Sequence, residues 1–238
     1  MSTKKLLFYL LAVLLGGCLP VMSLHPLFNE KDVVFDKKLL STWVDDPNSP
    51  ETTWDFKRAD GKENAYRLIF SDKDGKGLFV ANLVKLKDKL FLDVHLGESP
   101  VDAVEKLELE VLGEVKDPNK VNFWVYNALF LIPAHTFIKV DAIGPQLILR
   151  LTDDEKMKEF LKADPNAVKH EFLADPNAVK HVFFVDETGP GPILTASTKE
   201  LQAFVLKYAD DSRVFTEAIV LSRKKAAEPN APPPSKRR

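Results

Sequence analysis

Residues 52–96 read TTWDFKRADGKENAYRLIFSDKDGKGLFVANLVKLKDKLFLDVHL and carry the clearest structural signal in the chain. Residues 52–57 and 66–71 both alternate apolar with polar side chains, which is the period of a half-buried β-strand. Polar, glycine-bearing residues separate the alternating segments and suit tight turns. The stretch therefore predicts an antiparallel β-meander.

The same pattern continues through the rest of this stretch and beyond it. Residues 77–87 and 89–96 form a predicted hairpin across Lys87-Asp88, and residues 121–132 form a nearly continuous apolar run. The first half of that run alternates like a strand, whereas its second half fits either a buried helical turn or a cap over the core, which periodicity cannot separate. We expect a mainly β fold, an antiparallel meander closing into a barrel, with further strands at 39–44, 107–111, 136–141, 146–151 and 216–222.

Two helices are predicted to pack outside this barrel. Residues 152–161 begin with Thr152 and Glu155 at capping-box spacing, and Ser197 with Glu200 repeats that spacing before a second helix. The second helix has the clearer apolar stripe, at spacings of three and four residues. We expect both helices on the outer surface.

One internal repeat lies between the predicted helices. Residues 163–170 (ADPNAVKH) recur as residues 174–181. In each copy the aspartate suits the cap of a short helix that begins at proline, and two copies are too few for a solenoid. We interpret residues 163–181 as a duplicated loop. Its histidines, His170 and His181, are either metal ligands or solvent-exposed copies of one residue, and the second interpretation is preferred.

The N-terminus has the layout of a secretory signal. Lys4 and Lys5 precede an apolar run over residues 6–17 that is too short to span a bilayer. The ending Leu15-Gly16-Gly17-Cys18 resembles the lipobox of bacterial lipoproteins. This resemblance implies a signal peptide over 1–17, acylation of Cys18 as the new N-terminus, and a lipidated tether over 18–38 that leads to a domain at 39–225.

Composition narrows the classes of function. Without residues 1–17 the chain carries 31 basic and 35 acidic residues, so it lacks the basic surface that nucleic acid requires. Cys18 is the single cysteine, which leaves no disulfide and no thiol for catalysis. The proline-rich basic tail at 226–238 (AEPNAPPPSKRR follows Ala226) is predicted to be disordered.

The search for catalytic chemistry finds little. No nucleophile elbow, zinc motif, phosphate loop or redox pair of cysteines is present, so we expect no enzyme, no cofactor and no metal. Asp93 and His95 share one strand face and would suit acid–base work, but a polar pair on the outer face of a sheet explains them as well. His135 is interpreted as a hydrogen-bonded structural histidine in preference to a ligand.

The aromatic residues fall on successive predicted strands. Residues 39–43 (LLSTW) place a tryptophan in the first strand, which resembles the start of a lipocalin, with Ser41 where that family usually has glycine. The late helix before a closing strand is similar to the helix beside such barrels. An eight-stranded barrel either holds one small ligand or is filled by side chains. If a ligand cavity exists, we expect it to be lined by Trp54, Tyr66, Phe70, Phe91 and Phe137.

The leading functional hypothesis is a membrane-anchored envelope lipoprotein that binds a hydrophobic small molecule or lipid. The alternative is a structural or assembly lipoprotein with a solid barrel and an unidentified protein partner. Residues 23–27 (SLHPL) resemble a segment found after the lipidated cysteine of uncharacterised envelope lipoproteins. Leu19 is not the aspartate that retains lipoproteins at the inner membrane of enteric bacteria, so we expect the outer membrane, facing the periplasm.

Overall fold

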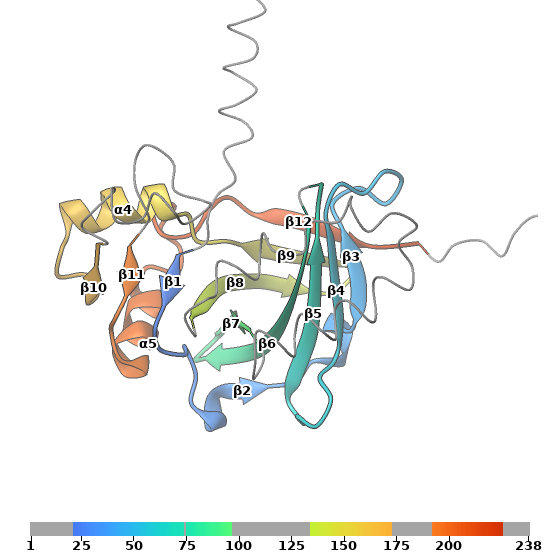
Figure 1. Cartoon of the computed structure of the whole chain (residues 1–238), viewed down its shortest axis with the longest axis horizontal. Coiled ribbons are helices and arrows are strands. Elements are labelled where there is room, and N and C mark those ends of the chain that lie inside the picture. Colours follow the sequence, from blue (N-terminus) through green and yellow to red (C-terminus); the bar gives the residue numbers. More distant parts are fainter. Residues whose placement is uncertain (1–20, 74, 97–133, 173–191, 226–238) are drawn as a thin grey trace, which may run out of the picture.

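Eight antiparallel strands close into a barrel in the computed structural model, which describes residues 21–73, 75–96, 134–172 and 192–225 (Figure 1). Each strand pairs with the next, β12 lies between β9 and β3, and the β8–β9 pairing completes the circle. The predicted mainly β barrel is confirmed, and it is compatible with a lipocalin-like barrel. The barrel strands are β3 (Ser41–Val44), β4 (Thr53–Arg58), β5 (Ala65–Ser71), β6 (Lys76–Leu86), β7 (Lys89–His95), β8 (His135–Ile143), β9 (Gln146–Arg150) and β12 (Ile219–Arg223).

The strand register follows the alternation in the sequence. Trp54 on β4 lies opposite Phe70 on β5, and two residues along Phe56 lies opposite Leu68, so these side chains share the inner face. The predicted hairpin between β6 and β7 is confirmed, and Lys87 at its turn has φ of 57°, the left-handed conformation of a tight turn.

Shorter elements and two helices lie outside the barrel, and the helices lie on one side of it (Figure 1). No helix among the described residues combines the length and the apolar character needed to cross a bilayer. The outer elements are β1 (Met22–Ser23), η1 (Glu30–Asp32), β2 (Val33–Val34), η2 (Lys37–Leu39), α4 (Asp154–Ala163), β10 (His170–Glu171), β11 (Ile193–Leu194) and α5 (Thr198–Lys207).

The two helices differ in how they begin. The predicted capping box of α5, Ser197 with Glu200, is confirmed. The predicted cap of α4 is wrong, because Asp153 is the N-cap and its side chain accepts a hydrogen bond from the backbone N–H of Lys156 at 2.9 Å. The Thr152 hydroxyl instead accepts from the backbone N–H of Val21 at 3.2 Å.

Two hydrophobic cores result from this arrangement. The first fills the barrel and receives side chains from the inner face of all eight strands. The second lies between the outer face of the barrel and the helices, where Phe91 and Phe137 meet Phe160 of α4 and Phe204 of α5. On β7 successive residues therefore serve different cores: Leu92 points inward and Phe91 outward.

The first copy of the repeat is part of the fold. Asp164 is the C-cap of α4 and is followed by a turn, so the predicted short helix beginning at Pro165 is wrong for this copy. Val168 is buried in the second core, and the carbonyl of Lys169 accepts hydrogen bonds from the backbone of residues 195 and 196. His170 is half-buried with its ring edge-on to Phe172.

Several predicted features lie outside the described residues: Cys18, the strand at 107–111, the run at 121–132, the second copy with His181, and the tail.

Candidate functional site

The five aromatics expected to line a ligand cavity divide between the two cores. Trp54, Tyr66 and Phe70 belong to the barrel interior, whereas Phe91 and Phe137 lie outside the barrel beneath the helices. The interior three come together in part: Trp54 packs edge-on against Phe70, with ring centroids 4.9 Å apart. Of the five predicted residues, only Trp54, Tyr66 and Phe70 could line a cavity inside the barrel.

Three large side chains are fully buried in the barrel interior. Trp43 and Tyr66 are 0% exposed and Phe56 is 1% exposed. A side chain beside a void wide enough for water would expose area to that void, so none of these three borders one. The Trp43 indole N–H donates to the Leu39 carbonyl at 3.0 Å, and so its polar group is satisfied within the protein.

One end of the barrel is closed by the segment that leads into β3. The Tyr66 hydroxyl accepts from the Asp36 backbone N–H at 2.7 Å and donates to the Asp36 carbonyl. Phe35 stacks on the Tyr66 ring at 4.7 Å, and the Arg58 guanidinium lies over Phe35 at 4.2 Å. Burial of the phenol raises the pKa of Tyr66 to about 12, which keeps it neutral and able to donate.

A buried polar cluster lies on the outer face of β6, β7 and β8. Asp93 is 0% exposed, and its two carboxylate oxygens have different partners. Oδ1 lies 2.6 Å from Nδ1 of His135, and Oδ2 accepts from the backbone N–H of Leu27 at 2.7 Å. Both oxygens are therefore satisfied by charge-assisted hydrogen bonds, which is the condition for burying a carboxylate.

The second histidine of this cluster, His95, packs against the first. The rings of His95 and His135 lie 4.9 Å apart. Nδ1 of His95 faces the Leu96 carbonyl and Nε2 faces the Asn82 amide nitrogen, which fits a neutral ring that donates from Nδ1 and accepts at Nε2. Burial lowers the pKa of His95, and the nearby carboxylate of Asp93 offsets this in part. The ring therefore stays neutral near pH 7.

A serine lies next to the polar cluster. Ser23 lies directly opposite His135 across the β1–β8 pair, but its hydroxyl donates to the His25 carbonyl and accepts from the His25 backbone N–H. It is therefore committed to its own turn, not to the histidine. No group of three metal-ligating side chains occurs in the parts of the chain that the structure describes. Asp93 and His95 share one face of β7, as predicted, but the Asp93 carboxylate contacts His135 directly and not His95.

One contact of the cluster, from the Leu27 N–H to Asp93, fixes the N-terminal segment to the barrel. Residues 23–27, called here the SLHPL segment, run between the outer face of the barrel and α5. Thr198 of α5 donates to the Pro26 carbonyl at 2.8 Å, and Gln202 donates to the Leu27 carbonyl at 2.9 Å. Leu27 itself is 0% exposed in the second core. The predicted tether is thus part of the packed domain from residue 21 onward.

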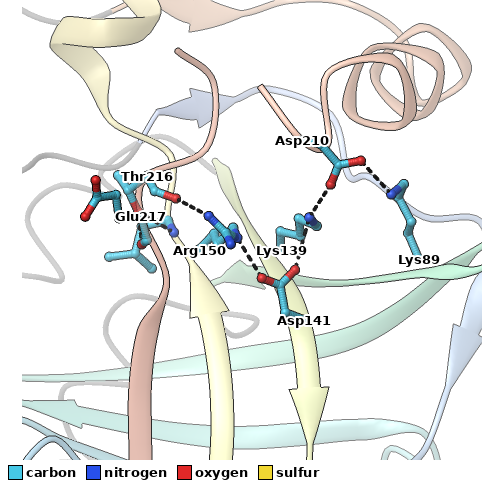
Figure 2. Close-up of polar contacts among 8 residues, drawn as sticks. Lys89, Lys139, Asp141, Arg150, Asp210, Thr216 and Glu217 are labelled. Carbon is cyan, nitrogen blue, oxygen red and sulfur yellow. Dashed lines mark hydrogen bonds and ion pairs between the residues drawn. The ribbon is translucent and has the colours of Figure 1, made fainter. Parts of the chain in front are cut away.

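A chain of charged residues ties the end of α5 to the barrel strands (Figure 2). Asp210, after the helix, is bound by Lys89 of β7 at 3.0 Å and by Lys139 of β8 at 2.8 Å. Lys139 also contacts Asp141 at 3.0 Å, and Asp141 accepts from Arg150 of β9 at 2.6 Å. The charges alternate in sign along the chain, so every contact is attractive and the chain links the segment after α5 to β7, β8 and β9.

The pKa values in this chain follow from its contacts. Hydrogen bonds from Lys139 and Lys89 lower the pKa of Asp210 to about 2. Burial alone would lower the pKa of Lys139, but its bonds to Asp210 and Asp141 raise it above its usual value. Asp210 and Lys139 are therefore charged near neutral pH. No local pattern in the sequence predicts this chain, because its members lie on three strands and in the segment after α5.

The fold and its sites define a class of protein: a closed eight-stranded antiparallel barrel with a hydrophobic core inside it, two outer helices and an N-terminal segment fixed to its wall. Comparisons of the chain with protein-family models, with curated proteins and with solved structures find no match.

Proposed function

We propose that this chain is a lipid-anchored protein of the bacterial cell envelope whose barrel is a solid scaffold, used to hold a protein partner at the membrane surface. The observation that carries the proposal is the burial of three large side chains inside the barrel: Trp43, Phe56 and Tyr66 are each at most 1% exposed, so none of them borders a water-sized gap. A carrier of hydrophobic molecules needs unoccupied volume at the centre of its barrel.

The outer surface supports the same proposal. The buried cluster around Asp93 and the charged chain at Asp210 both join separate elements to the barrel wall. Such contacts fix the outer elements rigidly, and a rigid surface loses little conformational entropy on binding a partner. Neither site supplies a free nucleophile.

Binding of a hydrophobic ligand is the second candidate, and one observation favours it. Trp54 and Phe70 lie at the end of the barrel opposite Phe35, and Phe70 is half-buried. A ligand in this position would contact these two rings at the barrel end and would not reach Phe91 or Phe137.

The lipid anchor rests on the sequence Leu15-Gly16-Gly17-Cys18. Acyl chains on Cys18 would hold the protein at a membrane, and Leu19 favours the outer membrane, facing the periplasm. Replacing Cys18 by Ser should release the protein from the membrane fraction. Continued retention of C18S would contradict the anchor.

A probe titration tests the solid barrel. Wild-type protein should give no saturable fluorescence increase with 1-aminoanthracene, an apolar dye. The variant Phe56→Ala removes a buried ring from the interior and provides the matched control with room for the dye. Saturable binding to the wild type, or a stoichiometric apolar molecule extracted from the purified protein, would overturn the scaffold. Crosslinking in cells to one stoichiometric envelope protein would support it.

A further inference from the structure

The start of the described chain is fixed to the domain, not free above it. The backbone N–H of Val21 donates to the Thr152 hydroxyl at 3.2 Å, and Val21 is 3% exposed. Immediately after it, β1 pairs with both β8 and β11. Thr152 lies two residues before α4 begins at Asp154. The position of Val21 is therefore tied to the base of α4.

Covalent geometry then limits the distance from this point to Cys18. The two positions are three Cα–Cα steps apart, and each step spans at most about 3.6 Å in an extended chain, so their Cα atoms lie within about 11 Å of each other. The polar headgroup layer of one leaflet is itself roughly 5–8 Å thick. A protein anchored through Cys18 would thus have no slack in which to turn or to rise from the bilayer.

We infer that the face of the domain that carries Val21 and α4 rests on the phospholipid headgroups, with the barrel end at η1 and β2 directed away from them. This inference rests on the proposed acylation of Cys18. In Figure 1, α4 lies at the top and β2 at the bottom, so the two are well separated. The chain thereby places the helix α4, more than a hundred residues from the anchor, closer to the membrane than η1.

The charges on α4 indicate what holds this face down. Its exposed residues include Glu155, Lys156, Glu159 and Lys162, which carry both signs equally. Attraction to anionic lipid therefore contributes little net force. The short covalent connection holds the face down, and so the orientation should be the same on neutral and on anionic vesicles.

Two matched labelling sites test the orientation. Lys156 on α4 and Lys31 on η1 are both exposed lysines, and each can be replaced by Cys. Acylated Cys18 cannot react with maleimide, so a fluorophore attaches at the new cysteine alone. The full-length lipidated variants are reconstituted into phosphatidylcholine vesicles that contain a lipid with a nitroxide on its headgroup. K156C should be quenched several-fold more strongly than K31C, although Lys31 is much nearer to Cys18 in the sequence.

A linker variant provides the control. A Gly/Ser insertion of about 20 residues after Pro20 has a root-mean-square length of about 25 Å and should remove the difference between the two labels. Equal quenching of K156C and K31C without the linker would overturn the orientation. Labelling of the wild-type chain by maleimide would show instead that Cys18 is free, and so would overturn the anchor and not the geometry.

Discussion

Asp93 is the residue whose replacement tests the polar cluster most directly. Asp93→Leu keeps the branching and the number of side-chain heavy atoms but removes both acceptors, which leaves the Leu27 N–H and Nδ1 of His135 without a partner. A hydrogen bond to a charged group contributes about 1.5–3 kcal/mol, and an unsatisfied buried N–H costs about 1–3 kcal/mol. We therefore expect the free energy of unfolding to fall by about 3–5 kcal/mol, or about 6–20 °C in Tm for a domain of this size.

The amide variant separates the hydrogen bonds from the charge. In Asp93→Asn the amide oxygen can accept from Leu27, and the amide N–H₂ can donate to His135 if that ring takes its other neutral tautomer. The loss should then be about 1–2 kcal/mol, because neutral hydrogen bonds replace charge-assisted ones.

Urea denaturation followed by tryptophan fluorescence measures both variants, in the full chain with Cys18→Ser so that no detergent is needed. Asp55→Leu is the matched control, since Asp55 also lies on the outer face of the barrel and is bound by Thr42 and Lys57, but its side chain is 20% exposed. It should cost at most about 1 kcal/mol. A D93L variant as stable as D55L, or less affected than D93N, would refute the proposed role of the cluster.

Three further predictions follow from burial and charge. Leu27→Ala should destabilise the domain by about 2–5 kcal/mol in the same assay, because the side chain is 0% exposed, whereas Leu24→Ala, at a residue 41% exposed, should have almost no effect. Asp210→Asn should cost about 0.2–1 kcal/mol, and the cost should shrink in high salt, since the Asp210 side chain is 74% exposed. The pKa of Tyr66 is raised to about 12, so its contribution to stability is full below about pH 10 and is lost as the pH rises to about 12. The free energy of unfolding of the wild type should therefore fall across this range, and Tyr66→Phe should remove that part of the pH dependence.

The barrel was predictable because its signal is local. Alternation with period two identifies a strand from five or six residues, and the side chains of Trp54 and Phe56 then have to lie on one face. The place of β12 between β9 and β3 is a long-range pairing, but an eight-stranded meander needs a closing strand and residues 216–222 are the last candidate. The prediction of the α4 cap was wrong because Thr152 and Asp153 both suit the N-cap position. The Thr152 hydroxyl accepts a hydrogen bond from the Val21 N–H, and Asp153 caps the helix.

The functional sites were less predictable, for a physical reason visible on β7. Residues 91–94 (FLDV) are all buried, and a strand buried on both faces normally reads as a continuous apolar run. An aspartate within such a run requires a buried partner, so the sequence held a sign that Asp93 was unusual. The sequence held no sign of which residues that partner would be. Leu27 and His135 lie 66 and 42 residues away from Asp93 and meet it only in the folded barrel.

The position of Leu27 connects the fold to the proposed location. A lipoprotein with a long flexible tether needs no specific contact between its N-terminal segment and its domain. In this chain Asp93, Thr198 and Gln202 all bind the backbone of residues 26 and 27, and the segment completes the second core. Removing the segment would expose that core, so folding and the distance from domain to anchor are set by the same few residues. A change that frees the SLHPL segment should therefore reduce stability and orientation together, whereas a linker after Pro20 should alter the orientation alone.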